Sequence, residues 1–244
     1  MLIVHDGRLP GEYVSSIRNR APQAELLPFE GIRTPLKNKD CVYGSILSHP
    51  DIYLFQLDER TIVHAPGLDD RQVAAIEKLG IDLIKGEKDP YGAYPGTAGY
   101  NAVRIGKRIF HNLKCTDKVI LEKARERALK SVNVEQGYTR CSVMVLAETA
   151  MITSDKGIAA AARAEDLDVL LISPGFVSLP GEKYGFFGGV SGKSGEGVLF
   201  VLGDLDMHPA ASEIKGFLAK YNIKYISAKG LPLYDAGGLF VFDR

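Results

Sequence analysis

The segment from residue 142 to residue 175 decides the fold of this chain. It contains two short apolar runs, residues 142–146 (SVMVL) and 150–153 (AMIT), an alanine-rich stretch at 158–164 (IAAAARA) and a third apolar run at 168–172 (DVLLI), and it closes on Ser173-Pro174-Gly175. Apolar runs of this length between turn residues predict β-strands, and the alanine-rich stretch predicts a helix. The segment therefore predicts a unit of two strands, a helix and a third strand, written ββαβ.

The same order of elements recurs about every 40 to 50 residues, which is typical of a repeat architecture. Three more copies are predicted at 52–57, 61–64, 69–79 and 81–84, at 102–105, 108–111, 117–129 and 132–134, and at 186–190, 198–202, 209–221 and 223–227. A fifth copy is divided between the two ends of the chain. Residues 238–242 supply its first strand, and residues 2–5, 12–19 and 25–27 supply its second strand, helix and third strand.

Pairing of the two end strands would close the units into a ring. Closure removes the unpaired strand edges that an open sheet exposes to aggregation. The sequence therefore predicts an α/β protein built as a five-fold pseudo-symmetric propeller, with residues 1–244 as one domain. An ordinary α/β sheet with accidental spacing is the alternative.

Composition limits the classes of partner. The chain of 244 residues is 45% hydrophobic and has 30 basic and 30 acidic residues, so its formal net charge is zero. No cluster of Lys or Arg is long enough to follow a phosphate backbone, so we expect no nucleic-acid partner. No apolar run reaches the roughly 18 residues of a membrane span, and no signal peptide begins the chain. We therefore expect a cytoplasmic protein with no membrane partner, for which a small-molecule ligand is the class of partner left; its oligomeric state stays open.

The cysteines do not predict a metal or disulfide site. Cys41, Cys115 and Cys141 form an odd set that lacks the Cys-x-x-Cys spacing of zinc sites, which fits reduced thiols. We predict neither a metal nor a cofactor.

Candidate catalytic residues lie where predicted strands begin. His49-Pro50-Asp51 precedes an apolar run, and residues i and i+2 of a strand face the same side. A carboxylate beside an imidazole orients it and raises its proton affinity, as acid/base catalysis requires. Alternatively, Asp51 caps local backbone and His49 is merely exposed.

Cys141 lies at a comparable position, ahead of residues 142–146. It is a candidate nucleophile, because the neighbouring Arg140 would lower the pKa of its thiol if that side chain turned inward. Alternatively, Cys141 packs as a small buried hydrophobe.

Five further residues are candidates for ligand binding. Asn101 and Asp235 precede predicted strands, and Gly188, Gly189 and Lys193 belong to a glycine-rich stretch. This stretch is not a phosphate loop, because Phe187 stands where the motif needs its first glycine and a strand follows where a helix is needed. It predicts a hairpin connection over the pocket, with Lys193 and Ser194 able to contact an anionic ligand as a lid.

Five ββαβ units closed by the chain ends resemble the pentein family, the propeller of arginine and agmatine deiminases, dimethylarginine hydrolases and amidinotransferases. His49-Pro50-Asp51 is similar to the His-x-Asp element of these guanidine-modifying enzymes, and Asp235-Ala236-Gly237-Gly238 is similar to the approach to their last strand. The nucleophilic cysteine of the family directly follows that approach. Here the stretch reads Leu239-Phe240-Val241-Phe242 and has no cysteine.

The resemblance implies three possible functions. The leading hypothesis is a divergent pentein that binds a small guanidino or amino-acid-like ligand in a polar central pocket without family catalysis. The second is a hydrolase or amidinotransferase that uses Cys141 with His49 and Asp51. The third is a ribosome- or protein-interaction module, because the family also includes ribosome-binding anti-association factors. A Cys141 sulfur within about 4 to 5 Å of His49 would favour the second hypothesis.

Overall fold

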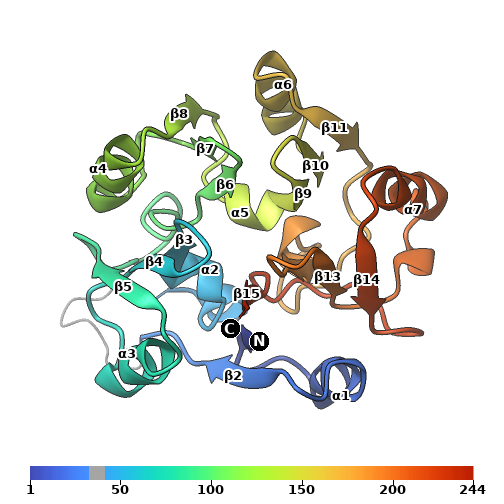
Figure 1. Cartoon of the computed structure of the whole chain (residues 1–244), viewed down its shortest axis with the longest axis horizontal. Coiled ribbons are helices and arrows are strands. Elements are labelled where there is room, and N and C mark those ends of the chain that lie inside the picture. Colours follow the sequence, from blue (N-terminus) through green and yellow to red (C-terminus); the bar gives the residue numbers. More distant parts are fainter. Residues whose placement is uncertain (33–41, 244) are drawn as a thin grey trace.

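The computed structural model describes residues 1–32 and 42–243 and shows five small sheets arranged as blades around a central axis (Figure 1). Each blade has three strands. The inner strand runs antiparallel to the middle strand, and the middle strand runs parallel to the outer strand. The helix that connects the middle and outer strands lies at the rim of the ring, as Figure 1 shows for α1, α3, α4, α6 and α7. This is the predicted pentein-like propeller of ββαβ units.

The elements follow one another blade by blade. The first blade has β1 (Leu2–Asp6), α1 (Gly11–Arg20) and β2 (Glu25–Phe29), and it takes β15 (Phe240–Phe242) as its inner strand. The second has α2 (Pro50–Tyr53), β3 (Leu54–Gln56), β4 (Thr61–His64), α3 (Asp70–Glu77) and β5 (Asp82–Lys85), and the single-turn 3-10 helix η1 (Gly44–Ile46) precedes it. The third has β6 (Val103–Ile105), β7 (Arg108–His111), α4 (Lys118–Glu126) and β8 (Lys130–Asn133).

The last two blades follow the same order. The fourth has α5 (Thr139–Ser142), β9 (Val143–Ala147), β10 (Ala150–Thr153), α6 (Lys156–Ala164) and β11 (Asp168–Leu171). The fifth has η2 (Gly188–Val190), β12 (Ser191–Lys193), β13 (Val198–Val201), η3 (Leu205–Met207), α7 (Ala211–Lys220) and β14 (Lys224–Ser227). The longest helices, α1 and α7, have 10 residues each, and no helix of the described residues has the length and apolar character that a membrane span requires.

The ring closes through the two ends of the chain, as the split fifth copy predicts. β1 pairs antiparallel with β15, in the register Leu2 with Phe242, Ile3 with Val241 and Val4 with Phe240. All six side chains are buried. Burial of one such apolar side chain stabilises a fold by about 1.5 to 3 kcal/mol, so packing as well as the strand ladder holds the closure together.

The middle strands form the buried centre of each blade. Ile3, Val63, Phe110, Ile152 and Phe200, one from each blade, are fully buried. Their hydrophobic clusters connect neighbouring blades, and each rim helix covers its blade with a narrow apolar face. Aspartates cap three of these helices: the side chain of Asp155, for example, accepts a hydrogen bond from the backbone N–H of Ile158 at 2.8 Å.

The inner strands begin later in the sequence than predicted. Residues 50–53 and 139–142 form the one-turn helices α2 and α5, so β3 begins at Leu54 and β9 begins at Val143. Pro50 occupies the first position of α2, where its fixed φ suits a helix and its missing N–H costs nothing. In the fifth blade residues 188–190 form a 3-10 turn, and the inner strand is Ser191–Lys193, inside the glycine-rich stretch.

Candidate active site at one mouth of the ring

The turns ahead of the inner strands bring polar residues to one end of the ring axis. His49 and Asp51 precede β3, Asn101 precedes β6, Cys141 precedes β9 and Asp235 precedes β15. The structure brings these five side chains together, and each is at most 3% exposed. We refer to this cluster as the mouth site. His49 and Asp51 meet there through the first turn of α2, not as neighbours on one face of a strand.

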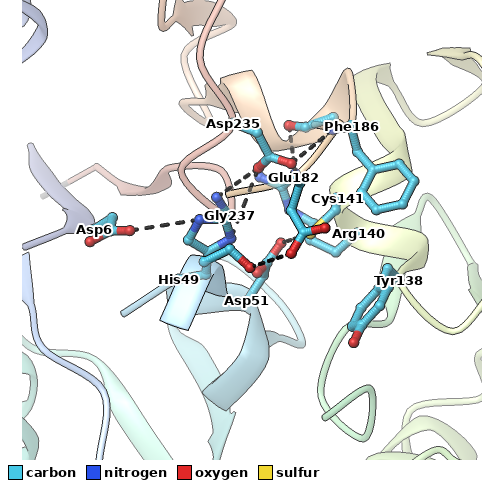
Figure 2. Close-up of polar contacts among 12 residues, drawn as sticks. Asp6, His49, Asp51, Tyr138, Arg140, Cys141, Glu182, Phe186, Asp235 and Gly237 are labelled. Carbon is cyan, nitrogen blue, oxygen red and sulfur yellow. Dashed lines mark hydrogen bonds and ion pairs between the residues drawn. The ribbon is translucent and has the colours of Figure 1, made fainter. Parts of the chain in front are cut away.

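Cys141 is held by hydrogen bonds with Asp51 of the second blade (Figure 2) and Asn101 of the third blade. Its Sγ donates to Oδ2 of Asp51 at 2.7 Å, and Nδ2 of Asn101 lies 3.3 Å from the sulfur. Asn101 also bridges the backbones, since its Nδ2 donates to the carbonyl of Asp51 at 3.2 Å and its Oδ1 accepts from the N–H of Cys141 at 3.1 Å. The sulfur and the carboxylate therefore keep a fixed relative position.

His49 lies between two other buried carboxylates. Its Nε2 is 3.7 Å from Oδ2 of Asp6, and its Nδ1 is 4.0 Å from Oδ1 of Asp235. A ring nitrogen of His49, a carboxylate oxygen of Asp51 and the sulfur of Cys141 all lie within 4.8 Å of one another. The sulfur therefore lies within the distance of His49 that favours the nucleophile hypothesis.

Two buried polar atoms of the mouth site lack a hydrogen-bond partner among the described residues: Nδ1 of His49 and Oδ1 of Asp51. A buried donor or acceptor without a partner costs about 1 to 3 kcal/mol. Such atoms mark a place where a bound molecule would supply the missing bonds.

Burial dominates the electrostatics of the site. It raises the pKa of the Cys141 thiol well above its usual range, and the charges of Asp51 and Asp235 add to the effect. Burial also raises the pKa of Asp51 to about 6, although His49 and the thiol hydrogen bond oppose the shift. Unless a further cation is present, the thiol of Cys141 is therefore protonated, and it donates to the carboxyl group of Asp51, whose pKa is raised.

Arg140 turns its guanidinium toward the axis, yet it does not lower the pKa of Cys141 below the usual value. Nη1 donates to the carbonyl of Gly188 at 3.3 Å, and Nη2 donates to the carbonyls of Ser191 at 3.0 Å and Leu239 at 3.4 Å. Burial lowers the pKa of Arg140 itself. The proposed activation by Arg140 is therefore outweighed by desolvation of the thiol and by the nearby carboxylates.

Aromatic side chains border the mouth site on its outer side. The hydroxyls of Tyr43 and Tyr138 are 3.0 Å apart, and the ring centroids of Tyr138 and Phe186 are 6.2 Å apart. Figure 2 shows the rings of Tyr138 and Phe186 beside Cys141 and Arg140. Aromatic faces of this kind attract cations.

His49, Asp51 and Cys141 offer one nitrogen, one oxygen and one sulfur within 4.8 Å of one another, and each is an atom type that zinc accepts as a ligand. The sequence spacing does not predict this set, because its members come from two different blades. Three protein ligands are the number that catalytic zinc sites use, with the fourth position open.

The predicted ligand-binding glycines border the mouth site by close packing. A Cβ on Gly189 would lie 1.9 Å from Oδ1 of Asp235, and a Cβ on Gly188 would lie 2.4 Å from the backbone nitrogen of Val143. The carbonyl of Gly189 accepts from the N–H groups of Ala236 and Gly238 at 3.1 and 2.8 Å. These glycines let the backbone approach Asp235, and this packing explains why they do not form a strand.

Lys193 and Ser194 do not form a lid over the mouth site. They lie at the C-terminal end of β12, whereas the mouth site lies where the inner strands begin, and Ser194 is 1% exposed. Its backbone N–H donates to the carbonyl of Val198, which makes this stretch the β12–β13 hairpin. Of the other cysteines, Cys115 donates to the carbonyl of Asn112 in a loop, and Cys41 lies outside the described residues.

Asp6 is a member of the site that the sequence did not single out. It ends β1, and its carboxylate accepts from the N–H of Arg8 at 2.7 Å and from the hydroxyl of Ser48, in addition to facing His49. The signal that could have indicated Asp6 is its position: it is a carboxylate at the end of an apolar strand in the blade that is divided between the two ends of the chain.

The five blades give this chain the pentein fold, a five-bladed α/β propeller. It is similar to a dimethylarginine dimethylaminohydrolase mutant from Pseudomonas aeruginosa complexed with citrulline, at 8% identity and a TM-score of 0.52, covering 93% of this chain and 91% of that chain. It is also similar to an amidinotransferase of the saxitoxin pathway from Microseira wollei, at 10% identity and a TM-score of 0.52, covering 93% of this chain and 87% of that chain. A third similar structure is the inosamine-phosphate amidinotransferase of Streptomyces griseus, at 12% identity and a TM-score of 0.52, covering 95% of this chain and 78% of that chain. At these identities the likeness shows the fold alone.

The chain belongs to the family of unknown function DUF6873, whose model matches residues 22–240. The sequence matches none of the curated proteins.

Proposed function

We propose that this protein is a cysteine-dependent enzyme that acts on a small cationic guanidino compound at the mouth site. The observation that carries the proposal is the 2.7 Å hydrogen bond from Cys141 to Asp51, with His49 inside the same 4.8 Å cluster. A nucleophile, a carboxylate acceptor and an imidazole are the groups that covalent attack on a guanidinium carbon needs.

The charge of the site favours a cation as ligand. Three buried carboxylates, Asp6, Asp51 and Asp235, surround His49, and Oδ1 of Asp51 has no partner among the described residues. A guanidinium N–H would satisfy that oxygen with a charge-assisted hydrogen bond. Its positive charge would also lower the pKa of the Cys141 thiol, offsetting the effect of the carboxylates.

The reaction then follows from the positions of the groups. The thiol proton passes to the Asp51 carboxylate, and Sγ forms a bond to the guanidinium carbon. The C–N bond to the leaving amine breaks as His49 supplies a proton to that nitrogen, which leaves an amidino group on sulfur. Water, in a hydrolase, or a second amine, in an amidinotransferase, then attacks the same carbon and passes a proton to His49. The C–S bond breaks, and the proton held by Asp51 returns to the sulfur and restores the thiol.

Labelling and turnover test the proposal together. A haloacetamidine probe should modify Cys141 in the wild type and in Cys115→Ser, and labelling at position 141 should be absent in Cys141→Ser. A panel of arginine, agmatine, methylated arginines and guanidinoacetate should contain a compound that slows this labelling and releases an amine, ammonia or urea. The absence of Cys141 labelling at alkaline pH, together with no turnover across the panel, would refute the enzyme.

Binding without turnover is the second candidate function. It is favoured by Leu239, which stands where the related enzymes carry their cysteine, and by the raised pKa of Cys141. It predicts that a guanidino compound raises the melting temperature without being consumed, and that Asp51→Asn removes this stabilisation.

A further inference from the structure

A cavity lies at the end of the ring axis opposite the mouth site. It has a volume of about 1000 Å³ and is lined by all five inner strands, through Gln56, Arg104, Val145, Lys193 and Val241 among others. The mouth site lies where these strands begin, whereas the cavity continues to the loops that follow them. We call this cavity the axial channel.

Arg140 separates the axial channel from the mouth site. It lines the channel, and its neighbour in the chain is Cys141. Its guanidinium is held by backbone carbonyls of η2, β12 and the turn before β15, and it lies 5.8 Å from the ring centre of Phe240. A Cβ on Gly238 would come within 2.7 Å of it, so only glycine leaves room for this side chain.

The inner part of the channel is basic. Arg104, Arg140 and Lys193 line it and are at most half exposed, and among the described residues their recorded side-chain hydrogen bonds go to carbonyl oxygens only. Arg104, for instance, donates to the carbonyls of Leu57 at 2.6 Å and Gly106 at 2.9 Å. None of these three partly desolvated cations is paired with a carboxylate of the described residues. Their position around one cavity therefore favours a bound anion.

The rim of the channel is predominantly acidic. Glu59, Glu148 and Glu196 line it and are exposed, and Arg60 is the exposed cation beside them. A dianion such as phosphate would have to pass these carboxylates, whereas a molecule with an ammonium group would be attracted to them. The charge pattern therefore changes from acidic at the entrance to basic inside.

We propose that the axial channel is a second ligand site, distinct from the mouth site, which binds a small linear zwitterion. The carboxylate of the ligand reaches Arg104, Arg140 and Lys193, and its ammonium group stays at Glu59 and Glu148. This site goes beyond the proposed function, because it needs neither Cys141 nor any step of the reaction there.

Calorimetric titration of the whole chain with ω-aminocarboxylates tests the proposal. The probes are γ-aminobutyrate and ε-aminocaproate, with caproate and hexylamine as analogues that carry only one of the two charges. At least one aminocarboxylate should bind about tenfold or more tightly than both single-charge analogues, since each charged contact contributes about 1.5 kcal/mol or more.

Matched variants locate the binding. Arg104→Gln and Lys193→Gln should each weaken aminocarboxylate binding about tenfold. Arg20→Gln, on the exposed end of α1, should leave it unchanged. Glu148→Gln should weaken binding of the aminocarboxylate and not of caproate, and because Glu148 is exposed this variant folds even if Arg104→Gln does not.

Cys141→Ser should remove the proposed catalysis at the mouth site and leave aminocarboxylate binding in the axial channel unchanged. This variant therefore tests the two proposals independently of each other. The channel proposal is overturned if no aminocarboxylate binds more tightly than caproate and hexylamine, or if Lys193→Gln and Glu148→Gln bind the probes as the wild type does. Loss of binding in Cys141→Ser would place the ligand at the mouth site and would also overturn it.

Discussion

Replacement of Asp51 by Asn should change the stability of the protein in a pH-dependent way. Relative to wild type, the variant should be more favoured at neutral pH than at acidic pH. The carboxyl of Asp51 is fully buried, and burial raises its pKa from 3.8 to about 6. Between these two values the folded state binds more protons than the unfolded state, so the wild-type contribution to stability falls as pH rises and is lowest above about pH 6. A shift of about 2 units corresponds to about 3 kcal/mol of unfolding free energy.

Urea unfolding followed by circular dichroism measures this effect. The free-energy difference between Asp51→Asn and wild type should move in favour of the variant by most of that 3 kcal/mol between about pH 4 and pH 8. Any pH-independent cost of the amide cancels in the comparison. A difference that stays constant over this range would show that Asp51 is not a desolvated carboxylate in the folded protein.

Asp168→Asn supplies a control with the opposite sign. Hydrogen bonds from Lys220 and Tyr221 lower the pKa of Asp168, so its contribution is present at neutral pH and is lost as pH falls. The difference between this variant and wild type should therefore change in the reverse direction. If both variants gave the same sign, the pH dependence would belong to the unfolded chain.

Three further substitutions, and one control in α7, test the packing around the axis. Gly189→Ala should destabilise the fold by about 1 to 3 kcal/mol, because its Cβ would lie 1.9 Å from Asp235, while Gly216→Ala in α7 meets nothing within 4 Å and should be neutral or stabilising in thermal unfolding. Ile3→Ala should cost about 2 to 5 kcal/mol and leave a single cooperative unfolding transition, since a separate early transition would mean that ring closure is not coupled to the other blades. Arg140→Lys should lower the melting temperature by leaving carbonyls of the axis unpaired, because an ammonium cannot reproduce the planar fork; an unchanged melting temperature would contradict that role.

The blades were predictable because their signal is local. Each middle strand is a short apolar run such as residues 150–153, and each helix shows helical spacing after a capping residue such as Asp155. The closure was predictable because the first strand of one unit and the remainder of that unit stood at opposite ends of the chain. The one-turn helices at Pro50 and Thr139 were missed, because four residues ahead of a strand carry no periodicity.

The site was predictable in part for the same reason. His49, Asp51 and Cys141 stand at strand starts, and a ring brings strand starts together. The partners that set their chemistry, Asp6 beside His49 and the carbonyls around Arg140, lie far away in sequence. Burial then decides the pKa of Cys141, and burial follows from the assembled blades rather than from the neighbouring Arg140.

Closure of the ring by β1 and β15 bears on how the chain folds. The pairing joins residue 2 to residue 242, whereas the other strand ladders join residues that lie much closer in the sequence, such as Leu54 and His64. Contacts between such distant residues form late, because the entropy of closing the intervening loop is lost before the contact stabilises the chain. Asp6 ends β1, shortly after the closing contact, and Asp235 precedes that contact by a few residues. We therefore expect folding intermediates with several formed blades in which His49 does not yet have its two carboxylate neighbours, so that chemical reactivity of the mouth site reports the final folding step.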